Sequence, residues 1–183
     1  MLFDSTPHRL SFPLTGLMKY PALNNFINGS PAPCNRDRLD VLSPLDGTSL
    51  SSVPLSGSAE LDAAVTAARQ AQPAWAALTQ RERSQLFFTY RELLRSHMEE
   101  LAGLIHEENG KTIPEARAEI DKAMELTEFA CSLPQLTGGE VLEVSRGFYC
   151  SQQLEALGVV ASITPFNFPS MVPHWTIPVA LAL

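Results

Sequence analysis

The middle of the chain carries apolar side chains at helical spacing. Between Leu86 and Ile105, apolar residues recur every three or four positions, which predicts an amphipathic helix. Thr79 precedes this stretch, and Glu82 follows three residues later, a spacing typical of a helix capping box. Asn109-Gly110 is typical of a helix C-terminus. The pattern therefore predicts one helix between these two signals, with its many charged residues, Arg83 among them, mostly on a solvated face.

Two further helices flank this one. The first is expected to start with Ser58 as N-cap and to run to about Gln72, where Pro73 ends or kinks it. The other starts with a second capping box, Thr112 to Glu115. Its inner face is predicted to consist of Ile113, Ala116, Ile120, Met124, Thr127 and Cys131. Such a stripe is typical of a packed core, so Cys131 is expected to be a buried thiol.

Short strands surround the helices. Residues 1–20 show no period and are expected to form an extended arm. A short strand ends in the Asn28-Gly29 turn, and strands over 38–42 and 49–55 are joined by a turn at 43–47. After the break at Gly138-Gly139, strands over 140–145 and 148–154 are expected to form a hairpin.

The stretch from Leu157 to Pro169 contains the most distinctive pattern. Leu157–Ile163 is an apolar, β-branched run of strand length with almost no polar alternation, which predicts a central strand of a parallel sheet. Pro165 ends the strand, and a helix can begin at Ser170. Asn167 then lies in a rigid turn where the strand ends, and the fold class is predicted to be α/β. Ligands of open α/β sheets bind at this end of the strands, although an Asn in a turn more often satisfies only its own backbone.

Composition narrows the function classes. The 183 residues are 45% hydrophobic and 18% charged, which predicts a globular protein. A formal charge of −7 argues against nucleic acid or an anionic membrane as a partner. Cys34, Cys131 and Cys150 form no C-x-x-C pair, so we predict no metal site and a reducing compartment. We expect a cytoplasmic protein, or one of the mitochondrial matrix in a eukaryote.

The run Pro165-Phe166-Asn167-Phe168-Pro169 resembles a signature of the NAD(P)-dependent aldehyde dehydrogenase family. The residues from Met171 to Ala180 look most like its methylmalonate-semialdehyde dehydrogenase branch. The resemblance implies that Asn167 is catalytic, as part of an oxyanion hole. It implies that Ile163, Thr164, Pro165 and Phe166 lie against NAD. It also implies a small aldehyde as substrate, a cysteine thioester, and coenzyme A as acyl acceptor, with water as the alternative.

The resemblance extends from about Phe26 to Leu183 and implies the N-terminal part of a Rossmann-like cofactor-binding domain. Residues 1–137 would form its arm, hairpin and helices. Residues 138–157 would form a β-hairpin for oligomerisation in a homodimer or homotetramer, and residues 158–183 the first core strand, the Asn turn and a helix start. The family's nucleotide loop, catalytic Glu and nucleophilic Cys would lie beyond Leu183. The sequence stops within an apolar run that no helix-ending residue follows. We therefore interpret the C-terminus as a truncation.

Two other hypotheses remain open. The chain could be a non-catalytic α/β module that binds a nucleotide or a subunit, since it contains no visible nucleophile–base pair. It could also be a helical interaction protein. This hypothesis accounts only for residues 58–133 and does not explain the Asn turn. The Gly110-Lys111-Thr112 segment does not indicate a phosphate loop, because the required upstream glycine position holds Ile105.

Overall fold

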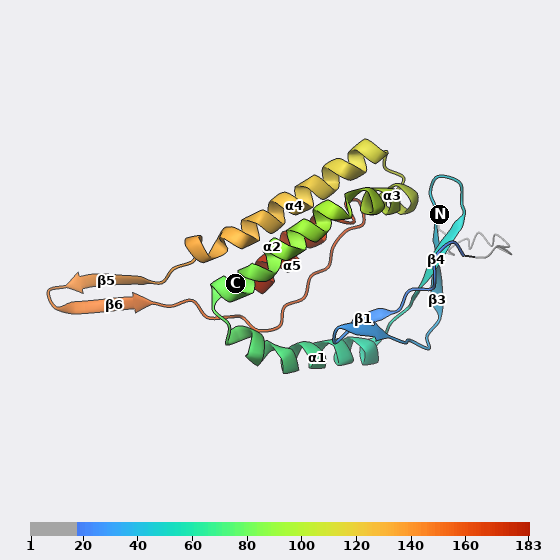
Figure 1. Ribbon diagram of the computed structural model, residues 1–183. Coiled ribbons are helices and arrows are strands. Elements are labelled where there is room, and N and C mark those ends of the chain that lie inside the picture. Colours follow the sequence, from blue (N-terminus) through green and yellow to red (C-terminus); the bar gives the residue numbers. More distant parts are fainter. Residues whose placement is uncertain (1–17) are drawn as a thin grey trace, which may run out of the picture.

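The computed structural model describes residues 18–183 (Figure 1). The elements follow in the order β1 (Asn25–Ile27), β2 (Ser30–Ala32), β3 (Arg38–Leu42), β4 (Ser49–Pro54), α1 (Ser58–Ala76), α2 (Gln80–Ser96), α3 (Met98–Asn109), α4 (Ile113–Leu136), β5 (Glu140–Ser145), β6 (Phe148–Gln152) and α5 (Met171–Ala182). The fold is therefore mixed, with helices forming most of its packed part. The predicted arm falls largely on residues 1–17, outside the described residues.

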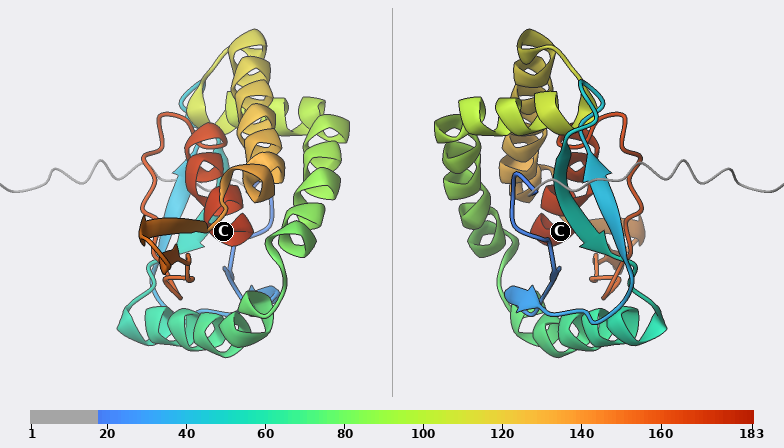
Figure 2. Two further views of the ribbon diagram at one scale, coloured as in Figure 1. Left: turned by 90° about the vertical axis from the view of Figure 1, so that its left-hand side faces the viewer. Right: turned by 90° about the vertical axis from the view of Figure 1, so that its right-hand side faces the viewer.

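Helices α2, α4 and α5 lie side by side and form the largest core (Figures 1 and 2). Phe87 of α2, Ala130 and Leu133 of α4, and Ala182 of α5 are buried against one another. A second cluster joins α3 to α4 through four buried residues, Ala102, Ile105, Ala116 and Ile120. Helix α4 takes part in both clusters, so it is the central packing element.

The strands form three separate two-stranded antiparallel sheets. The predicted Asn28-Gly29 turn joins β1 to β2, and both of its residues have positive φ angles, 53° and 74°. The predicted pair over 38–55 is present as β3 and β4. The third sheet is the β5–β6 hairpin, which projects away from the helices beyond the end of α4 (Figure 1). The apolar side chains along this hairpin are exposed.

The helix boundaries confirm both predicted capping boxes and correct two details of α1. The Thr79 and Thr112 hydroxyls accept from the backbone N–H groups of Glu82 and Glu115. Helix α1, however, has Gly57 as its N-cap, and the Glu60 carboxylate accepts the Gly57 N–H at 2.7 Å. The helix also continues through Pro73 to Ala76, so this proline does not end it.

The single helix predicted between residues 79 and 109 is wrong. It breaks at His97, which ends α2 and serves as the N-cap of α3 with φ −104° and ψ 14°. The change of direction, visible in Figure 1, brings Ala102 and Ile105 onto α4. A continuous helix would carry these two apolar side chains away from α4, so tertiary packing overrides the local helical pattern.

The predicted parallel strand Leu157–Ile163 does not form within the described residues. These residues have no regular secondary structure, and Leu157 and Ile163 are 94% and 99% exposed. A strand needs a neighbour for its backbone hydrogen bonds, and every strand in residues 18–183 pairs within its own hairpin. The whole connection between β6 and α5 instead runs past α1 to the end of α3 before α5 turns back (Figure 1).

Side chains of Arg83 and Trp75 donate hydrogen bonds to the last residues of α5. Arg83, predicted on the solvated face of its helix, is only 7% exposed. Its guanidinium donates to the backbone carbonyls of Ala182 at 3.1 Å and Leu183 at 2.6 Å. The Trp75 indole donates to the Leu181 carbonyl at 2.9 Å. These donors satisfy oxygens that have no partner within the helix. In residues 18–183, no helix has the length and apolar character needed to cross a membrane.

Candidate active site

The predicted turn at residues 165–169 is present and leads directly into α5. Phe166 and Asn167 form a turn, and Ser170 is the N-cap of the helix that begins at Met171. Ser170 makes no side-chain cap of its own. The backbone N–H groups at the start of α5 therefore depend on an acceptor from elsewhere in the fold.

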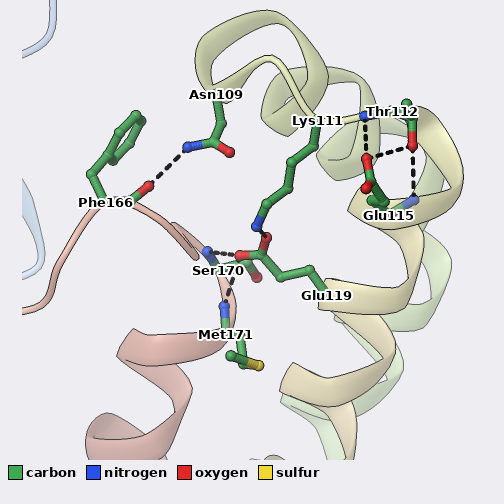
Figure 3. Close-up of polar contacts among 8 residues, drawn as sticks. All are labelled: Asn109, Lys111, Thr112, Glu115, Glu119, Phe166, Ser170 and Met171. Carbon is green, nitrogen blue, oxygen red and sulfur yellow. Dashed lines mark hydrogen bonds and ion pairs between the residues drawn. The ribbon is translucent and has the colours of Figure 1, made fainter.

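That acceptor is Glu119 of α4, whose carboxylate is buried (Figure 3). Its Oε1 atom accepts the backbone N–H of Ser170 at 2.7 Å and that of Met171 at 3.1 Å. Its Oε2 atom forms an ion pair with Lys111 Nζ. The ammonium of Lys111 also lies 3.8 Å from the centre of the Phe168 ring, a cation–π contact.

A second contact holds the turn on the other side of Asn167. The Asn109 side chain, at the end of α3, donates from Nδ2 to the Phe166 carbonyl at 2.8 Å (Figure 3). A peptide unit is planar, so fixing this carbonyl also fixes the direction of the Asn167 N–H. The loop between α3 and α4 thus holds the turn both before and after Asn167.

Asn167 itself is exposed. In the part of the chain that the structure describes, no hydrogen bond joins its side-chain amide to its own turn, which is held by Asn109 and Glu119 instead. Its amide can therefore donate to a ligand. The alternative that Asn167 serves only to satisfy its turn is not favoured by this arrangement.

The four predicted cofactor residues lie immediately before Asn167. Ile163, Thr164, Pro165 and Phe166 are all exposed, with Phe166 at 54%. Their mainly apolar surface fits the face of a planar ring, and no acidic side chain occurs between Ala156 and Ser170 to repel a phosphate. The residues therefore fit the role predicted for them.

The three cysteines do not lie in this site. Cys34 is buried near the N-terminal sheets, and Cys150 is exposed on β6. Cys131 is only partly buried, which corrects the prediction of a fully buried thiol, because it lies at the margin of the α2–α4–α5 core. Burial nonetheless raises the pKa of the Cys131 thiol, which disfavours the nucleophilic thiolate. In residues 18–183, no cluster of His, Cys, Asp and Glu side chains could hold a metal ion.

His174 connects the start of α5 to α2. Its Nδ1 lies 2.6 Å from the Ser170 carbonyl, which can only accept, so Nδ1 carries the proton. Its Nε2 then accepts from the Tyr90 hydroxyl at 2.8 Å, and the two rings stack with their centres 5.6 Å apart. Burial lowers the pKa of His174, although the hydrogen bond to Ser170 opposes this shift. The neutral ring is therefore the favoured form in the folded chain.

This His174 pKa predicts a pH dependence of stability. Because the folded-state pKa lies below the unfolded one, the unfolded chain binds the extra proton first. The stabilising effect is fully present above the unfolded pKa of about 6.5 and is lost as the pH falls from there. We expect the urea midpoint of His174→Gln to fall less than that of the wild type between pH 7.5 and 5.5. Exposed His97→Gln is the control, and an unchanged pH dependence in His174→Gln would contradict the prediction.

Sequence reasoning missed Glu119 and gave Lys111 and Asn109 no role at the turn. Glu119 lies next to Ile120 and one turn before Ala123, on the face of α4 that packs into the core. An acidic residue on an apolar stripe is a detectable signal, because such a side chain needs a buried partner. The sequence does not show that this partner is the start of a helix 51 residues away.

Comparison with known proteins identifies relatives of this chain. The chain is 41% identical over 162 residues to malonate-semialdehyde dehydrogenase 2 of Geobacillus thermodenitrificans, and 41% identical over 163 residues to a malonate-semialdehyde dehydrogenase of Listeria monocytogenes. These matches cover 87% and 88% of this chain, and 34% and 33% of the two relatives. The chain thus spans about a third of the length of the curated relatives it matches.

Solved structures show the same relationship. The methylmalonate-semialdehyde dehydrogenase of Oceanimonas doudoroffii superposes with a TM-score of 0.86 at 34% identity, over 89% of this chain and 34% of that one. A Sinorhizobium meliloti protein provisionally given the same enzyme name, and solved in complex with NAD, superposes with a TM-score of 0.85 at 36% identity, over 90% and 34% of the two chains. The aldehyde dehydrogenase family model matches residues 32–183, so this chain belongs to the aldehyde dehydrogenase family.

Proposed function

We propose that this chain is the N-terminal part of an NAD-dependent aldehyde dehydrogenase that converts malonate or methylmalonate semialdehyde to an acyl-CoA. The names of its relatives support the substrate class. The observation that carries the proposal is the exposed Asn167, held in a fixed turn before α5. In the complete enzyme a cysteine thiolate adds to the aldehyde carbon, and bound NAD accepts the hydride as the thioester forms.

The role of Asn167 follows from where negative charge develops. Addition of the thiolate converts the aldehyde oxygen to an oxyanion, and an amide N–H directed at that oxygen stabilises it. The Asn167 amide has no acceptor within its own turn, so this donor remains available to the substrate. A preorganised donor needs no rearrangement when the charge appears, which is the physical basis of its effect on the rate.

Residues 163–166 would form one wall of the cofactor site. Ile163, Pro165 and Phe166 offer exposed apolar surface, and burying it against a planar ring is favourable. We further propose that Leu157–Ile163 becomes the first strand of the cofactor-binding sheet in the complete enzyme. Val159 and Val160 already line an apolar groove of about 700 Å³ between α1 and α5. Such a wall of apolar surface favours further packing.

The 183-residue chain by itself is expected to form no NADH from propanal or malonate semialdehyde. It spans about a third of its relatives, and none of its cysteines lies beside the Asn turn. The measurement is absorbance at 340 nm with purified chain, NAD and aldehyde. Turnover that disappears when Cys34, Cys131 and Cys150 are replaced together would contradict the expectation.

The acyl acceptor separates the proposed activity from its nearest alternative. Sequencing the gene past codon 183 and expressing the whole reading frame gives the enzyme to test. With malonate semialdehyde and NAD, we expect a CoA thioester as product, detected by mass spectrometry, and a rate that depends on coenzyme A. A free carboxylic acid formed at the same rate without coenzyme A would show the carboxylate-releasing reaction instead.

We also propose that the β5–β6 hairpin contacts a second copy of the chain. Each strand pairs on one side only, which leaves backbone hydrogen-bonding groups free on the other. Its exposed apolar side chains are Val141, Leu142, Val144, Phe148 and Tyr149. Such an edge favours pairing with another strand, which suits a homodimer or homotetramer.

A charge on this hairpin should weaken self-association. We expect the wild-type chain to sediment as a dimer or larger species and Val144→Lys to shift it toward monomer, because a lysine at an edge opposes strand pairing. Leu61→Lys on α1 is the matched control, since Leu61 is exposed to a similar extent, 64% against 65%. A wild-type chain that is monomeric at high concentration, or equal effects of the two substitutions, would contradict the proposal.

A further inference from the structure

Helix α5 differs from the other helices in how its first turn is capped. Helices α1, α2 and α4 each use a carboxylate three residues into their own first turn, namely Glu60, Glu82 and Glu115. Helix α5 instead uses Glu119 of α4, from 51 residues away in the chain. A local cap fixes only that a helix starts, whereas this one also fixes where α5 starts relative to α4.

Glu119 makes this contact at a buried position. The residue is 3% exposed, and both of its oxygens are occupied, one by the Ser170 and Met171 N–H groups and the other by Lys111. Burying a charged pair seldom stabilises a protein more than apolar side chains of similar volume would. A positional function accounts for the presence of such a pair better than stability alone does.

The segment from Asn109 to Glu119 contacts the turn and the start of α5 at three successive points. Asn109 holds the carbonyl of Phe166, and Lys111 lies over the ring of Phe168. Glu119 holds the N–H groups of Ser170 and Met171. Asn167 lies between Phe166 and Phe168 in the chain, and its own side chain takes part in neither of the first two contacts.

We propose that Glu119, with its partner Lys111 and with Asn109, is a positioning residue that sets the direction of the Asn167 amide. The inference rests on the proposed function, in which that amide donates to the substrate oxyanion. Glu119 touches neither substrate nor cofactor in this scheme and acts through the start of α5. A misplacement of about 1 Å at a reacting centre typically costs about a hundredfold in rate.

Two variants and one control isolate this role. Glu119→Ala removes the acceptor of the Ser170 and Met171 N–H groups. Asn109→Ala releases the Phe166 carbonyl without leaving a buried charge, so it remains informative if Glu119→Ala does not fold. Glu115→Ala is the control, because it removes a helix-capping carboxylate four residues from Glu119 that does not contact the turn.

The first measurement uses the 183-residue chain. In ¹⁵N-edited NMR spectra, we expect Glu119→Ala to speed amide exchange at Ser170 and Met171 and to shift the Asn167 side-chain signals. Asn109→Ala should shift the same Asn167 signals, whereas Glu115→Ala should leave them in place. Asn167 signals that are unchanged in folded Glu119→Ala, or unchanged in Asn109→Ala, would overturn the proposal.

The second measurement uses the complete enzyme and separates position from stability. In single-turnover experiments, Glu119→Ala should slow acylation about ten- to a hundredfold while the Kd for NAD stays within about twofold. The combined variant Lys111→Met with Glu119→Gln restores an uncharged acceptor and should recover most of the rate. A Glu119→Ala enzyme with normal acylation would overturn the proposal. Normal acylation in Asn167→Ala, with the NMR shifts intact, would instead refute the proposed oxyanion role and leave the positioning role standing.

Discussion

In the complete enzyme, Asn167→Ala should slow thioester formation by about 10²–10³, equivalent to about 2.7–4 kcal/mol of transition-state stabilisation. In the proposed mechanism, the amide is directed at an oxygen that carries more negative charge in the tetrahedral intermediate than in the aldehyde. Its loss therefore raises the barrier more than it weakens substrate binding. Because Ile163 to Phe166 are unchanged in the variant, the Kd for NAD should stay close to the wild-type value.

Three measurements on this variant separate the catalytic role from a structural one. If Asn167 only fixed its turn, Asn167→Ala would lower the melting temperature and would weaken NAD binding through the displaced Thr164 and Phe166. The contacts from Asn109 and Glu119 argue for little change in either quantity, because they hold the turn without the Asn167 side chain. Asn167→Asp keeps the shape but loses the donor and adds a negative charge, so it should be at least as slow as Asn167→Ala. Normal acylation by a folded Asn167→Ala enzyme would refute the oxyanion role.

The sequence predicts the local signals of this fold well. Both Thr-x-x-Glu capping boxes and the Asn28-Gly29 turn are determined by a few neighbouring residues. Their hydrogen bonds close within four residues, so the pattern contains all the partners. The hairpin at 140–152 is predictable for the same reason, since its turn residues and alternation lie in one short segment.

The errors concern elements whose partners lie far away in the chain. Helix α3 leaves the direction of α2 at His97 because Ala102 and Ile105 pack on α4, which local periodicity does not reveal. The apolar run from Leu157 to Ile163 reads as a buried strand, but a strand forms only beside another strand. In the described residues it has no such neighbour and stays irregular.

The candidate site also combines a local signal with partners that lie far away in the chain. The motif around Asn167 identifies the turn and its chemistry, whereas the residues that hold it come from the α3–α4 loop and from α4. Lys111 belongs to a segment that resembles a phosphate loop only in part. In the sequence, Glu119 is a single acidic residue among apolar core positions. Their joint role depends on how α4 and α5 pack, and helix packing is a three-dimensional relation that one sequence does not show.

Ile120 lies beside this site and tests how strongly α4 supports it. The residue adjoins Glu119 in the chain, is 0% exposed, and belongs to the buried cluster with Ala102, Ile105 and Ala116. Two of these neighbours are alanines, whose short side chains have little scope to move into a space opened by a truncation. The cost of a truncation should therefore include the cavity as well as the lost transfer free energy.

We expect Ile120→Ala to lower the free energy of unfolding by about 2–5 kcal/mol, and Ile120→Val by about 0.5–1.5 kcal/mol. Leu136→Ala, at a side chain on α4 that is 64% exposed, is the matched control and should change it by less than about 0.5 kcal/mol. Urea denaturation followed by circular dichroism measures all three values. If Ile120→Ala and Leu136→Ala had similar effects, the α3–α4 cluster would not be the rigid support that holds Glu119, and through it Asn167, in place.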